Sequence, residues 1–220
     1  MLIERLSLKF SGDYIKKELE DRSLSVPTRP NYNIHIGHAC LVLNVHEGQW
    51  KVGQMMWGFG SGRATGQRII NARSEGILGQ PSFRFAIRSN RLVIPVDSFY
   101  VEKITGQSRK VHRVVPYSDS LMYIAGIWEP VDQKTNGFAV LTVKSNKDLL
   151  QLTHRMPLIF FDVQSAMNWC RPMTVGQINE WIGGTASSRL RHYQVSDRVM
   201  ADINAPMLHE PVQEHLTLFD

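Results

Sequence analysis

The sequence predicts an α+β fold: a single β-rich domain, built as a partly open, barrel-like sheet with peripheral helices. From residue 38 onward, short runs of Val, Ile, Leu and aromatic residues are bounded by Gly, Pro, Asn or Asp, which is typical of strands. Helical patterns lie between and after these runs without the strand–helix alternation of a Rossmann-type nucleotide site. No repeat or long linker divides the chain, so we expect one domain over residues 1–220.

The elements follow in order. Residues 1–10 predict a first strand, and residues 11–22 a short helix with Ser11 as its N-cap, after which Pro27 and Pro30 break the chain. Further strands are predicted over residues 39–45, 50–57, 92–94, 99–103, 110–115, 121–128, 138–143 and 158–161.

Turns and helices complete the prediction. Gly106-Gln107 and Asn136-Gly137 are expected hairpin turns. Residues 147–153 are expected to form one or two helical turns, and helices are predicted over 163–170 and 175–181, the second ending at Gly183-Gly184.

The charge and the hydrophobic pattern of the sequence limit the kinds of molecule that the protein is expected to bind. The formal charge is +5, and six arginines but one acid, Glu75, fall between residues 63 and 91. Planar guanidinium groups suit phosphate oxygens, so this stretch indicates either nucleic-acid binding or a solvated surface with ion pairs. Apolar runs of about 18 residues are absent, and residues 1–10 do not resemble a signal peptide, so we expect a cytoplasmic protein without membrane contact.

Neither cysteines nor histidines predict a cofactor site. Cys40 and Cys170 are expected to be reduced, buried thiols. His35, His38 and Cys40 lie close together, with His46 beyond, but a zinc site usually needs a fourth ligand in fixed geometry. We therefore expect no metal and no cofactor.

Three segments carry a family resemblance. They are Asn71-Ala72-Arg73-Ser74-Glu75, the stretch from Arg91 to Tyr100 that contains Asp97-Ser98-Phe99-Tyr100, and Arg155-Met156-Pro157-Leu158-Ile159. Met56-Trp57-Gly58-Phe59 and Ala125-Gly126-Ile127-Trp128-Glu129 fall at matching intervals. In this order and spacing the chain resembles the SRAP family, the SOS-response-associated peptidase-like proteins that handle abasic sites in single-stranded DNA. The resemblance implies the family's β-rich, partly open barrel with a basic groove.

The resemblance also implies a chemistry that this chain departs from. Family members use a cysteine at residue 2, whose amine and thiol together capture the abasic aldehyde; here the residue is Leu2. The family's glutamate and histidine fall on Val101 and Thr153, with Glu102 and His154 one step later. Successive side chains of an extended segment point to opposite faces, so we expect Glu102 and His154 to face away from the site and the chemistry to be impaired.

Candidate residues follow from the same comparison. The candidate catalytic residues are Asn71, Glu102 and His154. The candidate DNA-binding residues are Asn33, Trp57, Arg73, Arg84 and Arg155. Trp57 is expected either to stack on a base or to pack in the core, and Arg73 and Arg155 either to contact phosphates or to form ion pairs.

The C-terminal segment, residues 210–220, suggests a docking peptide. His215-Leu216-Thr217-Leu218-Phe219 resembles the peptide by which bacterial repair polymerases bind the sliding clamp, with Leu216, Leu218 and Phe219 as apolar anchors. The alternative is a tail folded on its own protein.

Three functions therefore stand open. The first is a DNA-binding module that recognises abasic or damaged DNA in the SOS response without covalent chemistry. The second is a working abasic-site cross-linking enzyme or peptidase that uses Met1, Glu102 and His154; the free amine of Met1 alone would allow only a reversible imine. The third is a phage-related protein-interaction module.

Overall fold

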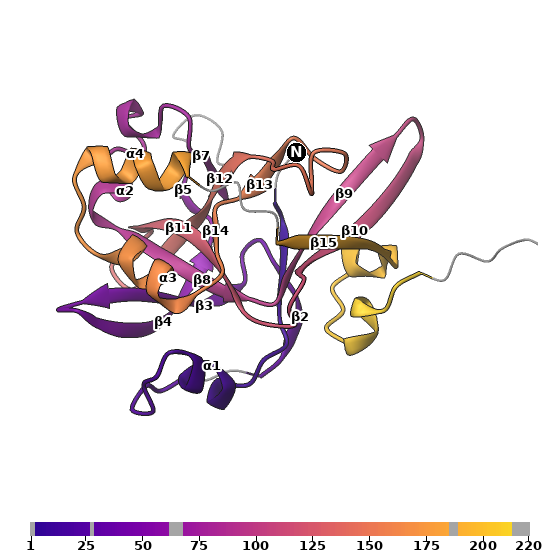
Figure 1. Ribbon diagram of the computed structural model, residues 1–220, viewed down its shortest axis with the longest axis horizontal. Coiled ribbons are helices and arrows are strands. Elements are labelled where there is room, and N and C mark those ends of the chain that lie inside the picture. The colour runs from indigo at the N-terminus through magenta and orange to yellow at the C-terminus, as the bar shows by residue number, and fades with distance from the viewer. Residues whose placement is uncertain (1–2, 27–28, 62–67, 185–188, 213–220) are drawn as a thin grey trace, which may run out of the picture.

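The computed structural model describes residues 3–26, 29–61, 68–184 and 189–212 (Figure 1). Two sheets dominate it. The larger sheet contains β3 (Ala39–His46), β4 (Gln49–Trp57), β7 (Asn71–Arg73), β8 (Arg91–Val96), β11 (Met122–Pro130), β12 (Asn136–Lys144), β13 (Arg155–Pro157) and β14 (Ile159–Phe160). The smaller sheet contains β1 (Arg5–Leu8), β2 (Asn31–His35), β9 (Ser98–Thr105), β10 (Ser108–Pro116) and β15 (Leu190–Val195). The short strands β5 (Phe59–Ser61) and β6 (Arg68–Ile69) pair with each other and form a separate two-stranded sheet.

The larger sheet closes on itself. Its strands follow the order β12-β4-β3-β8-β11, and β11 pairs again with β12, so these five form a ring. The strands β7 and β13 extend the ring on opposite sides of β12, where β7 pairs in parallel with residues 140–142 and β13 antiparallel with residues 142–144. The expected barrel-like sheet is therefore confirmed.

The core fills the ring. All six residues of β8 are buried, and burial on both faces explains why residues 92–96 form a continuous apolar run after Arg91. Trp57 and Phe138 stack with their ring centroids 6.0 Å apart, and both side chains are fully buried. The core therefore contains the aromatic residues of the β4 and β12 segments.

Short helices lie at the periphery (Figure 1). They are α1 (Gly12–Glu18), α2 (Ala86–Ser89), α3 (Val163–Cys170) and α4 (Val175–Gly183), with 3-10 helices η1 (Ile77–Gly79), η2 (Asp197–Met200) and η3 (Pro206–His209). Ser11 caps α1 as predicted, accepting the Tyr14 N–H at 3.3 Å, and Thr174 forms a capping box at α4. The predicted helix over 11–22 ends early, at Glu18, because Glu20 adopts a positive φ of 54°.

The turn predictions have mixed outcomes. Gly106-Gln107 joins β9 to β10 as predicted, with Gly106 at φ 60°. The predicted turn at Asn136-Gly137 is wrong, because both residues belong to β12 and the chain reverses over 131–135. Gly137 is needed within the strand, since a Cβ there would lie 2.5 Å from the carbonyl oxygen of Gly58.

Several short strands were not predicted, including β2, β7, β13 and β15. Among the described residues no helix is long and apolar enough to cross a membrane. The predictions for Met1, Leu2, Arg63 and the docking segment from His215 to Phe219 lie outside the residues that the structure describes.

Candidate functional site

The candidate phosphate-binding residues flank one end of β12. Arg73 is the register partner of Thr142 on one side, and on the other side the Arg155 guanidinium donates to the Thr142 carbonyl at 2.6 Å. Because side chains alternate along a strand, Asn71 and Arg73 share one face of β7. The sheet topology thus brings Arg155 close to the segment of residues 71–75, about 80 positions earlier in the sequence.

Arg155 forms an ion pair. Its guanidinium donates to both carboxylate oxygens of Glu75 at 2.9 Å, and these hydrogen bonds lower the pKa of Glu75 to about 2. The Glu75 side chain remains 47% exposed, so the pair lies at the surface. Of the two roles considered for Arg155, the structure contains the ion pair. Arg73, by contrast, is exposed and forms no ion pair with another described residue.

Asn71 contacts the segment that precedes β1. Its side-chain amide donates to the carbonyl oxygen of Ile3 at 2.9 Å, while its Oδ1 atom is buried without a partner among the described residues. A buried polar atom without a hydrogen bond is costly and needs an explanation. Asn71 therefore has one buried acceptor that no described residue pairs with.

Glu102 and His154 line a common pocket of about 680 Å³. Its other lining residues are Glu4, Arg5, Tyr100, Lys103, Ile104, Val111, Gln151, Leu152, Thr153 and Met200. Val101 is fully buried in the main core, whereas Glu102 is on the opposite face of β9 and pairs with Arg109 across the hairpin. The expected reversal of face between Val101 and Glu102 is therefore present, but Glu102 and His154 come together. Asn71 is not among the lining residues.

Thr153 occupies the position where the resemblance implies a histidine. Its side chain is buried, and its hydroxyl donates to the Arg155 carbonyl at 3.0 Å and accepts from the Arg155 N–H at 3.2 Å. Both contacts stabilise the turn that leads into β13. The hydroxyl is thus already committed to the backbone.

Two predicted DNA contacts are placed inside the protein. Trp57 is 0% exposed and its indole N–H donates to the Ile70 carbonyl at 3.0 Å, so no base can stack on this ring and core packing is the observed role. Asn33 is 2% exposed, and its side-chain amide donates to the carbonyls of Ala201 and Ile203. Asn33 therefore joins β2 to the segment after η2, a function that needs partners distant in sequence.

The arginine-rich stretch divides into two groups. Arg68, Arg84 and Arg88 are exposed, as a DNA-binding surface requires. Arg91 is buried and donates to the carbonyls of Trp169 and Arg171 at the C-terminal end of α3, while burial lowers its pKa. Arg91 is structural, although sequence alone does not distinguish it from its neighbours.

A buried polar cluster was not predicted. Asp97 accepts hydrogen bonds from Ser7 Oγ at 2.9 Å and from the Lys9 N–H at 2.6 Å, and it forms a buried ion pair with Arg113. His209 lies beside it, with Nε2 at 2.8 Å from Ser7 Oγ. The aspartate of the Asp97-Ser98-Phe99-Tyr100 segment thus stabilises the smaller sheet.

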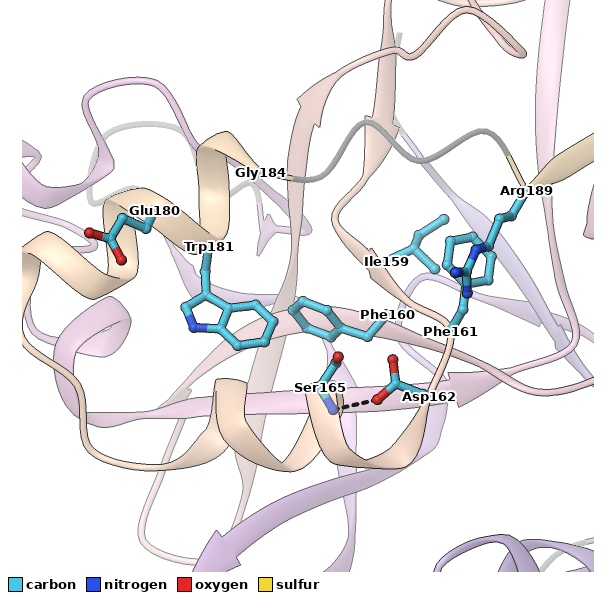
Figure 2. Close-up of a pocket in the computed structure, with 9 residues that line it drawn as sticks. All are labelled: Ile159, Phe160, Phe161, Asp162, Ser165, Glu180, Trp181, Gly184 and Arg189. Atoms are coloured by element: carbon cyan, nitrogen blue, oxygen red, sulfur yellow. Dashed lines mark hydrogen bonds between the residues drawn. The ribbon is translucent and has the colours of Figure 1, made fainter.

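A second pocket, of about 410 Å³, contains none of the candidate site residues (Figure 2). Phe160 of β14 and Trp181 of α4 line it side by side and pack edge to face, with their ring centroids 5.4 Å apart, and Asp162 and Ser165 at the start of α3 also line it. Its mixed lining identifies no ligand.

The SRAP family, "SOS response associated peptidase", matches residues 3–202, and the chain belongs to it. Among curated proteins, "Abasic site processing protein YoqW" of Bacillus subtilis is 27% identical over 193 residues, covering 83% of this chain and 84% of the relative. "Abasic site processing protein YobE" of the same organism is 28% identical over 65% of this chain and 69% of its own. A crystal structure of a Bacteroides thetaiotaomicron protein has the same fold, with a TM-score of 0.71 at 17% identity over 83% of this chain and 86% of its own.

Proposed function

We propose that this protein acts on abasic sites in DNA, as the names of its relatives state for them, and that it does so by holding single-stranded DNA without forming a stable covalent bond. Family membership supports the substrate class. We include in this proposal that the protein works in the DNA-damage response and is located in the cytoplasm, because its DNA substrate would be found in that compartment.

The surface around β7 and β13 supports strand binding. Arg73 is exposed and unpaired among the described residues, Lys144 is exposed nearby at the end of β12, and Arg155 needs only to exchange a half-exposed carboxylate for a phosphate. Exposed cations of this kind provide the salt-dependent affinity for nucleic acid.

The residues at the family's reactive positions support impaired chemistry. Val101 has no proton to transfer and is buried in the core, and the Thr153 hydroxyl is bound to the backbone of Arg155. Leu2 lacks the thiol that would close a ring with the captured aldehyde. No described residue replaces that pair of nucleophiles, since Cys40 and Cys170 are internal and buried.

A second candidate function is a working enzyme, which one observation favours. Glu102 and His154 line the same pocket, so an acid and a base could serve one reaction there. The chain's terminal amine would attack the aldehyde carbon of an abasic site, and loss of water would give an imine.

A labelled single-stranded oligonucleotide with one abasic site distinguishes the two functions. We expect a salt-dependent gel shift, but no band that survives denaturing electrophoresis. A stable cross-link that disappears in Glu102→Gln and His154→Asn would refute the binding-only proposal and establish the enzyme. Borohydride reduction before denaturation would trap an imine, and a trapped band would show that an amine of the protein reacts with the abasic aldehyde.

Arg73→Ala tests the surface. Removing one phosphate contact on a single strand should reduce the slope of log K against log salt by about 0.7. Arg22→Ala is the matched control, because Arg22 is exposed and follows α1 in the chain. Figure 1 shows α1 well away from β7. Equal affinities of the two variants would show that β7 does not contact the strand.

The docking of residues 210–220 on a sliding clamp and the role as a phage-related protein-interaction module stay predictions. A peptide of residues 210–220 titrated against a purified sliding clamp tests the docking segment, and absence of binding at tens of micromolar would exclude it.

A further inference from the structure

Two histidines and an aspartate meet at a corner of the smaller sheet. His35 ends β2, His38 lies in the turn before β3, and Asp202 belongs to the segment between η2 and η3. One ring nitrogen of each histidine and one carboxylate oxygen all lie within 4.8 Å of one another. Figure 1 shows β2 beside this C-terminal segment. The sequence pattern grouped Cys40 with these two histidines and predicted no metal there; in the structure the buried Cys40 thiol donates to the His38 carbonyl.

The hydrogen bonds of His35 orient its ring toward Asp202. Nδ1 lies 3.1 Å from the carbonyl oxygen of Ile36, and a carbonyl only accepts, so Nδ1 carries a proton. Metal-bound histidines commonly donate their other ring nitrogen in this way. The remaining nitrogen, Nε2, lies 3.2 Å from Asp202 Oδ1. Two ligands at about 2.0–2.1 Å from one tetrahedral zinc ion would lie roughly 3.3 Å apart.

Asp202 is held in place on both sides. Asn33, which is buried, donates to the carbonyls of Ala201 and Ile203 at 2.8 and 2.9 Å, the two residues that flank Asp202. Arg5 binds the next carbonyl upstream, that of Met200, at 2.8 Å. An exposed carboxylate with a fixed backbone loses little freedom when it binds a cation.

His38 is held by its backbone. Its N–H donates to the His35 carbonyl, and its carbonyl accepts from the Trp57 N–H, both at 3.0 Å. Gly37 between the histidines has a φ of 83°, a conformation that glycine adopts at little cost. The tight turn brings the two imidazole rings to a centroid distance of 3.5 Å.

We propose that His35, His38 and Asp202 form a binding site for a divalent transition metal of the Zn²⁺ type, with water at the fourth position. Two imidazoles and one carboxylate are a common donor set for such ions. The bound ion would connect the β2–β3 turn to the segment after η2. This inference is independent of the proposed DNA function.

Zinc titration of the chelator-treated full chain tests the site. We expect one equivalent to bind in the micromolar range or tighter, with a rise in thermal stability. Loss of a metal's supporting residue alone costs about 10–100-fold in affinity, so Asp202→Asn and His38→Gln should weaken binding by at least about 100-fold. Cobalt in place of zinc should give visible absorption bands that both variants lose.

Two matched controls test whether zinc binding belongs to this cluster or to exposed histidines in general. His46→Gln removes an exposed histidine at the far end of β3, and His112→Gln disrupts a second histidine pair, in which the Nδ1 atoms of His112 and His192 are 3.3 Å apart. Both should bind zinc like the wild type. The Asp202 side chain is 86% exposed, so Asp202→Asn should fold normally. Unchanged binding in Asp202→Asn, or no wild-type binding at micromolar zinc, would overturn the proposal.

Discussion

Replacing Asp97 by Asn should destabilise the protein more than any surface charge change. The carboxylate is 1% exposed and is paired with Arg113, which is 8% exposed. Asparagine retains the shape but not the charge, so the guanidinium would be left buried without a counter-ion. Removing one partner of a buried ion pair costs about 3–5 kcal/mol. In a chain of this length each kcal/mol lowers Tm by about 2–4 °C, so a fall of roughly 6–20 °C is expected.

Urea unfolding followed by circular dichroism measures this free energy of unfolding. The matched control is Asp119→Asn, which removes the surface pair with Lys9, where the aspartate side chain is 78% exposed. Exposed pairs contribute about 0–1 kcal/mol, so the control should unfold almost like the wild type. If the two variants lose equal stability, the reasoning that burial makes the Asp97 pair indispensable is refuted.

Substitutions at three other positions, His209, Gly137 and Glu75, should change the stability or the DNA affinity of the protein in a stated direction. Burial lowers the pKa of His209 to about 4, from an unfolded value near 6.5. Between these two pH values the unfolded state binds more protons than the folded state, so the free energy of unfolding falls as the pH drops from about 6.5 to about 4. In urea melts at a series of pH values, the free energy of unfolding of His209→Gln should depend less on pH than that of the wild type. Gly137→Ala places a methyl group against the Gly58 carbonyl and should cost about 1–3 kcal/mol in the same unfolding assay, and no change would mean that β12 can shift. Glu75→Gln releases Arg155 from its carboxylate, so the affinity for single-stranded DNA should rise at low salt in gel-shift titrations; weaker binding would show that the pair positions the strand.

Some of the site could be predicted because it depends on local order. The Asn71-Ala72-Arg73 triplet and the Arg155-Met156-Pro157 segment indicated the family. The hairpin turn at Gly106 could be predicted because glycine adopts the positive φ that such a turn needs. The reversal of face between Val101 and Glu102 followed from strand alternation alone.

Other roles depended on partners distant in the chain. Trp57 and Asn33 resembled contact residues, but both are buried against segments that folding alone brings near. Arg91 and Arg73 are identical in type, yet one caps a helix and the other is exposed. Exposure is a property of the packed structure, so a single sequence does not reveal it.

The sequence by itself determined the family, the strand-rich barrel, and the absence of a cysteine at residue 2, because these depend on residue identity, spacing and local backbone preference. The tertiary structure alone decided that Glu102 and His154 share a pocket, that Arg155 pairs with Glu75, and that Asp202 joins two histidines more than 160 residues earlier. Each of these depends on segments that lie far apart in the sequence and that the pairing of strands in the two sheets brings together, which local sequence does not specify.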